Sequence, residues 1–160
     1  MKEKAVEIKD LKEAFDSIVL CWLATVSSEG EPNVSPKELF FVLDTETLLI
    51  ANIASPQSLK NILQNSKVCV SGVNVFTQKG IQCKGIATII DPKDSDFKVH
   101  EKVFRPLIKG KFRIQNIISI KVKQTKKIIA PSYFFYPNTD EKEQIKQAKR
   151  RYLNYDDNED

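Results

Sequence analysis

The sequence lacks any apolar run long enough to cross a membrane, and the first residues are not followed by an apolar stretch. A transmembrane helix needs about 20 consecutive apolar residues, so no membrane span is expected. A secretory signal needs an apolar segment behind a charged start, and none is visible. We therefore expect a cytoplasmic protein that has no membrane partner.

Residues that usually carry metal or nucleophilic chemistry are also scarce. The single histidine, His100, lies on an expected helix without a recognisable Asp or Ser partner, as surface histidines do. Three cysteines, Cys21, Cys69 and Cys83, are odd in number, far apart and set in apolar segments, which is typical of reduced core cysteines. Alternating aspartates at 91–96 lack the glycine and distal glutamate of a calcium loop. No metal site is predicted.

Charge is unevenly distributed along the chain. Of its 160 residues, 41% are apolar and 29% charged, values typical of a globular protein that folds as one domain. The net charge is +4, with −2 in residues 1–80 and +6 in residues 81–160. Lysines and arginines at 109–127, near the aromatic residues 133–136, leave single-stranded nucleic acid as an alternative ligand. Alternating lysines on a strand usually form its solvent-exposed face, so we expect that the protein does not bind nucleic acid.

Apolar spacing predicts a mainly β chain with flanking helices. Strands joined mostly by hairpins, with one crossover helix, indicate an antiparallel barrel of six to seven strands. We expect one domain at 1–160, with a barrel core at about 18–136, a C-terminal helix at about 139–153 and an acidic tail at 156–160. The expected helices are 4–18, 56–65, 94–107 and 139–153, and the expected strands are 20–26, 33–43, 47–53, 67–75, 81–90, 114–123 and 127–135.

Pro36 falls in the expected strand 33–43, and Pro32 immediately precedes it. Proline cannot donate a hydrogen bond to a neighbouring strand. This strand should therefore bulge near Pro36 or lie at an edge of the sheet, where its backbone groups are available to a ligand.

A second feature is the start of the helix at 56–65. Ser55 is a suitable N-cap residue and Pro56 suits the first helical position. The unpaired backbone N–H groups and the positive end of the helix dipole favour a phosphate there. Ser58 and Asn61 lie three residues apart on this helix, with Lys60 beside them, so their donors could converge on it. An ordinary capped surface helix is the alternative.

Four segments, taken in order, resemble the pyridoxamine 5'-phosphate oxidase-like FMN-binding split β-barrel family, and the resemblance covers roughly residues 20–90. It implies an FMN-binding split barrel that forms a homodimer with the cofactor at the subunit interface. The segments are Trp22-Leu23-Ala24-Thr25-Val26, Pro32-Asn33-Val34-Ser35-Pro36-Lys37, Ser58-Leu59-Lys60-Asn61-Ile62-Leu63 and Gln82-Cys83-Lys84-Gly85-Ile86-Ala87.

The same resemblance implies roles for individual residues. One group would lie along the flavin, with its lysine directed at the phosphate or the ring edge, and a second would hold the phosphate. The helix start Pro56-Gln57-Ser58 replaces the Ser-Arg-Lys cluster of the true oxidases, so vitamin B6 oxidation itself is not implied. The first group is Ser35, Pro36 and Lys37, and the second is Ser58, Lys60, Asn61 and Gln82, of which Lys60 and Gln82 stand where relatives carry arginine.

The function implied by this resemblance is that of an FMN-dependent oxidoreductase, in which hydride passes through flavin N5. No side chain is assigned a catalytic role. A non-catalytic flavin-binding or sensing barrel is the alternative, and a nucleic-acid-binding barrel is a third. The aromatic run 133–136 could close the barrel or cover the flavin across the dimer interface.

Overall fold

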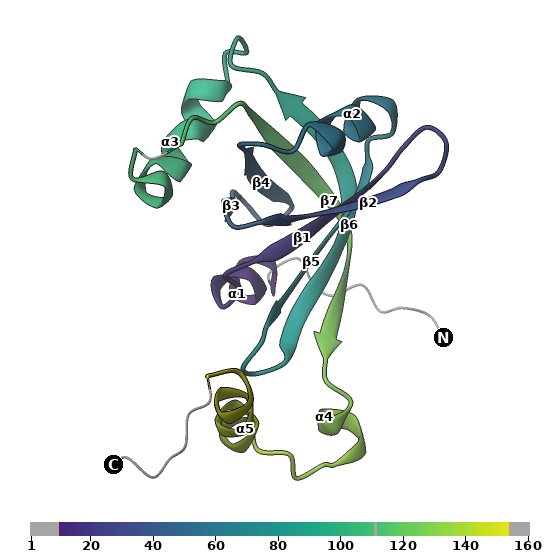
Figure 1. Cartoon of the computed structure of the whole chain (residues 1–160), viewed down its shortest axis with the longest axis vertical. Coiled ribbons are helices and arrows are strands. Elements are labelled where there is room, and N and C mark those ends of the chain that lie inside the picture. The colour runs from purple at the N-terminus through teal and green to yellow at the C-terminus, as the bar shows by residue number, and fades with distance from the viewer. Residues whose placement is uncertain (1–9, 111, 154–160) are drawn as a thin grey trace.

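The computed structural model describes residues 10–110 and 112–153, which form a curled sheet with helices around it (Figure 1). Residues 4–9 of the expected first helix and the expected acidic tail 156–160 lie outside the described residues. The elements are α1 (Asp10–Asp16), β1 (Cys21–Val26), β2 (Pro32–Lys37), β3 (Phe40–Val42), β4 (Thr47–Asn52), α2 (Pro56–Gln64), β5 (Lys67–Asn74), β6 (Lys79–Ile90), α3 (Phe97–Ile108), β7 (Asn116–Ile129), α4 (Ser132–Phe135) and α5 (Glu141–Leu153).

All the strands belong to one seven-stranded sheet in the order β2-β1-β5-β6-β7-β4-β3, and every neighbouring pair is antiparallel. The sheet curls into a half-barrel, which confirms the predicted split β-barrel with flanking helices. None of the helices in the described ranges combines the length and apolar character needed to cross a lipid bilayer.

Two hydrophobic cores lie on opposite faces of β4. Leu48 and Ile50 face the inside of the half-barrel, where α1 and α2 pack, whereas Leu49 and Ala51 face α3. A strand covered on both faces loses the apolar–polar alternation of a half-exposed strand. This explains why residues 48–51 form a continuous apolar run.

The predicted single strand at 33–43 was wrong, because the chain leaves one edge of the sheet and joins the other. β2 pairs with β1, and β3 pairs with β4. Between them, the Leu39 carbonyl oxygen accepts a hydrogen bond from the Ala51 N–H at 2.9 Å. The expectation of an edge strand is confirmed for β2, which pairs within the sheet only with β1. Pro36 therefore interrupts no hydrogen bonds to a second neighbouring strand.

The predicted boundary between strands at 114–123 and 127–135 was also wrong. β7 continues to Ile129, because the long strand β6 supplies partners as far as Lys79. The expected strand end becomes the short helix α4. The remaining helices, α2, α3 and α5, lie within three residues of their predicted boundaries.

Candidate functional site

The start of α2 lacks a capping hydrogen bond from a side chain, although Ser55 and Pro56 are residues typical of a capped helix start. Pro56 occupies the first turn, as predicted, and Ser55 is the N-cap residue. The Ser55 hydroxyl makes no cap hydrogen bond and instead accepts one from the Lys37 Nζ. The Ser55 N–H donates to Asn52 Oδ1 at 3.1 Å. The first-turn N–H groups of α2 are thus left without a side-chain acceptor.

Lys37 is the most unusual residue of this region, because its amine is buried. Its side chain leaves β2 on the inner face, opposite Cys21, and only 6% of the residue is exposed. In the part of the chain that the structure describes, the ion pairs involve other residues, and no carboxylate lies within 4.0 Å of Lys37. Burial lowers the pKa of Lys37.

Cys21 does not supply the missing negative charge. Burial raises the pKa of the Cys21 thiol to about 12, so the thiol stays protonated at neutral pH. A lysine in this position either loses its proton or binds an anion that provides the counter-charge.

A buried polar network fastens α2 to β1 and β2. The Asn33 amide donates to Thr25 Oγ1 at 3.1 Å and to Ser58 Oγ at 3.3 Å. Ser35 Oγ and Ser58 Oγ share a hydrogen bond of 3.0 Å, and the Asn61 amide donates to Thr25 Oγ1 at 3.0 Å. Ser58 and Asn61 are both buried. Their polar groups therefore point into the sheet and hold the first turns of α2 against β2.

A cavity of about 560 Å³ opens beside Lys37, between β2, the end of β4 and the end of α3. Its polar wall contains Ser35, Lys37, Glu38 and Ser55. The other walls are apolar and are formed by Leu20, Pro36, Leu39, Ala51, Ile53, Ala54, Leu107, Ile108 and Phe112. A cation, a hydroxyl and a helix N-terminus therefore meet at one end of an apolar cavity, which is an arrangement that can hold an anionic group.

The structure gathers only some of the predicted site residues. Ser35, Lys37, Ser58 and Asn61 lie in or next to the network and the cavity, and Pro36 lines the cavity. Lys60 is exposed on α2. Gln82 lies on the outer face of β6, because its neighbours Ile81 and Cys83 point into the core.

Three residues of this corner were absent from the predicted site. They are Thr25, Asn33 and Ser55. Sequence signals existed for two of them, since Ser55 is the expected N-cap residue of α2 and Asn33 alternates with Ser35 and Lys37 on a strand, so that these three share a face. Thr25 becomes a neighbour only through the antiparallel pairing of β1 with β2.

Residues 8–126 match the family model described as pyridoxamine 5'-phosphate oxidase. The chain belongs to this family. An uncharacterised protein of Methanocaldococcus jannaschii is 32% identical over 108 residues, which are 66% of this chain and 70% of that protein. The matched segment contains the whole polar network and the cavity, whereas α4 and α5 lie beyond it.

Solved structures share the fold. An FMN-binding protein of Syntrophomonas wolfei superposes with a TM-score of 0.66 at 13% identity, over 77% of this chain and 86% of the other. An F420 reductase superposes with a TM-score of 0.54 at 20% identity, over 72% of this chain and 94% of the other. At such low identities these two structures show the fold alone.

Proposed function

We propose that this member of the pyridoxamine 5'-phosphate oxidase family binds FMN and acts as an FMN-dependent oxidoreductase. The observation that carries the proposal is the buried amine of Lys37, which lies without a carboxylate partner at the uncapped start of α2. The FMN phosphate would lie at this helix start. The isoalloxazine ring would extend along Ser35, Pro36 and Lys37 into the apolar cavity.

A phosphate fits this corner on physical grounds. It would supply the negative charge that Lys37 lacks and would accept hydrogen bonds from the free N–H groups of the first turn of α2. Each charge-assisted hydrogen bond contributes about 1.5–3 kcal/mol. Loss of the Lys37 bond alone would then weaken binding by about tenfold or more.

The other predicted site residues have distinct roles in this proposal. Ser58 and Asn61 hold the first turns of α2 in place through their bonds to Ser35 and Thr25. Lys60 adds positive charge on the exposed side of the same helix. Gln82 lies on the opposite face of the sheet, so it would serve the cofactor of a second copy in a homodimer. We also propose a cytoplasmic location.

Bound FMN would supply the redox chemistry, by accepting and releasing a hydride at N5. The chain would bind and orient the cofactor. Its Lys37 cation would favour negative charge on the bound molecule, and its apolar walls at Leu39, Ile53 and Ile108 would exclude water.

The family membership and the fold shared with an FMN-binding protein support this proposal, and the F420 reductase makes the deazaflavin F420 the natural competitor. The test begins with the visible spectrum of the purified protein and the identity of any released chromophore. Titration with FMN and with F420, followed by fluorescence quenching, then compares the two cofactors. Saturable FMN binding, and reduction of the bound flavin by NADH or NADPH, are expected.

Three results would change the assignment. Bound FMN that neither NADH nor NADPH reduces would favour a non-catalytic flavin-binding or sensing barrel. Absence of FMN binding, with or without uptake of F420, would refute the FMN assignment. Salt-dependent retention of oligonucleotides without flavin uptake would support the nucleic-acid alternative.

A further inference from the structure

The buried side chain of Lys37 forms part of the wall of a cavity that can admit a small molecule. Only 6% of the residue is exposed, and the cavity beside it has a volume of about 560 Å³ and mainly apolar walls. Sites for small organic ligands have volumes of about 300–1,000 Å³. A ligand in this cavity would therefore lie against Lys37.

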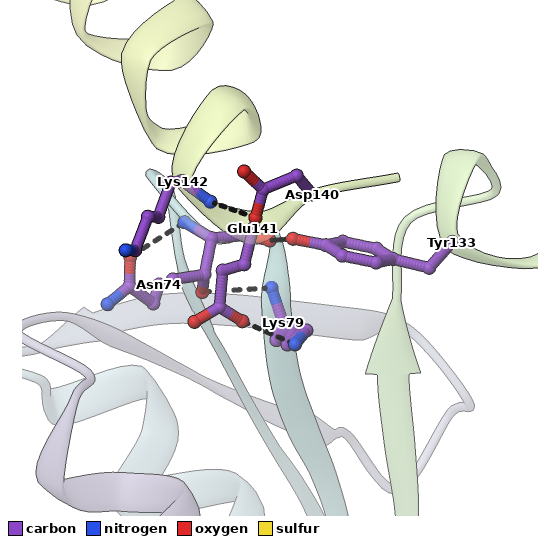
Figure 2. A network of polar contacts seen from close by, with 7 residues as sticks. Asn74, Lys79, Tyr133, Asp140, Glu141 and Lys142 are labelled. Carbon is purple, nitrogen blue, oxygen red and sulfur yellow. Dashed lines mark hydrogen bonds and ion pairs between the residues drawn. The ribbon is translucent and has the colours of Figure 1, made fainter. Parts of the chain in front are cut away.

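Lys79 illustrates what Lys37 lacks. Figure 2 shows Lys79 at the start of β6, where its ammonium group forms an ion pair with Glu141 and lies 4.7 Å from the ring centroid of Tyr133. The hydrogen bond to Glu141 raises the pKa of Lys79. Such an amine keeps its proton at neutral pH, and a protonated amine has no lone pair with which to attack a carbonyl group.

The groups around Lys37 do not stabilise a positive charge in this way. The hydrogen-bond partner of its Nζ is the uncharged hydroxyl of Ser55. Cys21, opposite on β1, stays protonated because burial raises the pKa of its thiol to about 12. Glu38 lines the same cavity, but it is exposed and is not among the ion pairs of the described residues. Burial therefore lowers the pKa of Lys37 and favours the neutral amine when no anion is bound.

We propose that the neutral amine of Lys37 captures an aldehyde as a covalent imine, with the apolar body of the aldehyde in the cavity. The nitrogen attacks the carbonyl carbon, and one amine proton moves to the carbonyl oxygen, which gives a carbinolamine. The hydroxyl group then leaves with the second amine proton as water, and the C=N bond forms. Amine and aldehyde thus give imine and water, so the step needs no oxidant or reductant.

Ser55 is placed to move these protons. Its hydroxyl is hydrogen-bonded to Lys37 Nζ, so it can accept a proton from the nitrogen while it passes its own proton to the oxygen. Ser55 is also the N-cap residue of α2, whose first-turn N–H groups have no side-chain acceptor. This end of the helix favours the negative charge that develops on the carbonyl oxygen during the attack.

The walls of the cavity select the class of aldehyde. Leu39, Ile53, Ile108 and Phe112 surround the space with apolar and aromatic side chains. An aromatic aldehyde would bury its ring against them. A polyhydroxylated aldehyde, such as a sugar, would place its hydroxyl groups where they find few hydrogen-bond partners.

Imine formation goes beyond the proposed cofactor binding and does not depend on it. A phosphate at the start of α2 would keep Lys37 protonated and would remove its lone pair. Bound FMN and a bound aldehyde would therefore exclude each other, and only this competition rests on the proposed function.

The test treats the folded full-length chain, without FMN and at neutral pH, with benzaldehyde and sodium cyanoborohydride, which reduces an imine to a stable secondary amine. Intact-mass spectrometry follows the adducts over time, peptide mapping locates them, and circular dichroism verifies folding. Wild type should gain its first adduct at Lys37, well before other lysines react. Lys37→Met should lose this early adduct, whereas Lys67→Met, which removes an exposed lysine at the start of β5, should keep it.

Two further comparisons test the roles of Ser55 and of the cavity walls. Ser55→Ala should slow the appearance of the Lys37 adduct, and Ser55→Thr, which restores a hydroxyl group, should recover the rate. Glyceraldehyde should show no preference for Lys37 over exposed lysines. An unchanged rate in Ser55→Ala would refute the proton relay.

Adducts that form first on exposed lysines, or an early adduct that persists in Lys37→Met, would overturn the proposal. Peptide mapping of the wild type gives this answer even if a variant does not fold. FMN binding without an early Lys37 adduct would refute imine formation alone. An early Lys37 adduct in a chain that does not bind FMN would support imine formation and refute the proposed function. Where the chain does both, excess FMN should delay the Lys37 adduct.

Discussion

Replacing Lys37 by methionine should affect cofactor binding and stability to very different degrees. Methionine fills nearly the same volume and removes a cation that is buried without a carboxylate partner. The lost hydrogen bond to Ser55 costs about 1 kcal/mol, and relief of the buried charge offsets a similar amount. The free energy of unfolding should therefore stay within about 1 kcal/mol of the wild-type value.

Binding of FMN should fall much further in the same variant. A charge-assisted phosphate bond contributes about 1.5–3 kcal/mol, which corresponds to a dissociation constant higher by about 10- to 150-fold. Quenching of flavin fluorescence measures the binding, and urea denaturation followed by circular dichroism measures the stability. Lys67→Met is the matched control, since Lys67 is an exposed lysine at the start of β5. Wild-type affinity in the Lys37 variant would refute the phosphate assignment.

Further predictions concern pH, thiol reactivity and packing. Burial lowers the pKa of Lys37 below 10.5 in the folded protein, so the unfolded chain binds more protons at pH values between the folded pKa and 10.5. The free energy of unfolding of the wild type should therefore increase relative to that of Lys37→Met as the pH rises toward 10.5. A difference between the two proteins in urea denaturation that does not change with pH would contradict this. Burial raises the pKa of Cys21 and that of Cys83 to about 12, so a thiol reagent at pH 8 should label these thiols at least about 100-fold more slowly in native than in denatured protein. Equal labelling rates would show that both thiols are accessible. In Gly80→Ala, the new Cβ would lie 2.1 Å from the Gly72 carbonyl oxygen, so the free energy of unfolding should decrease by about 1–3 kcal/mol and the melting temperature should fall. An unchanged melting temperature would show that the backbone accommodates the methyl group.

Local patterns were sufficient to predict most of the elements of the fold. Pro56 placed the start of α2, and apolar alternation located β5, β6 and most of β7, because capping and side-chain periodicity depend on near neighbours in the chain. The prediction failed between β2 and β3, where both segments are extended. Which edge of the sheet an extended segment joins depends on distant strands, and a local pattern does not encode that choice.

The candidate site divides in the same way. The sequence by itself indicated the fold family and predicted an anion site at the start of α2, which stays a prediction. Only the tertiary structure decided that Lys37 is buried without a counter-charge, and that Ser58 points into the sheet rather than toward solvent. Burial and partner choice arise when α2 packs across β1 and β2, so they are properties of segments brought together by folding.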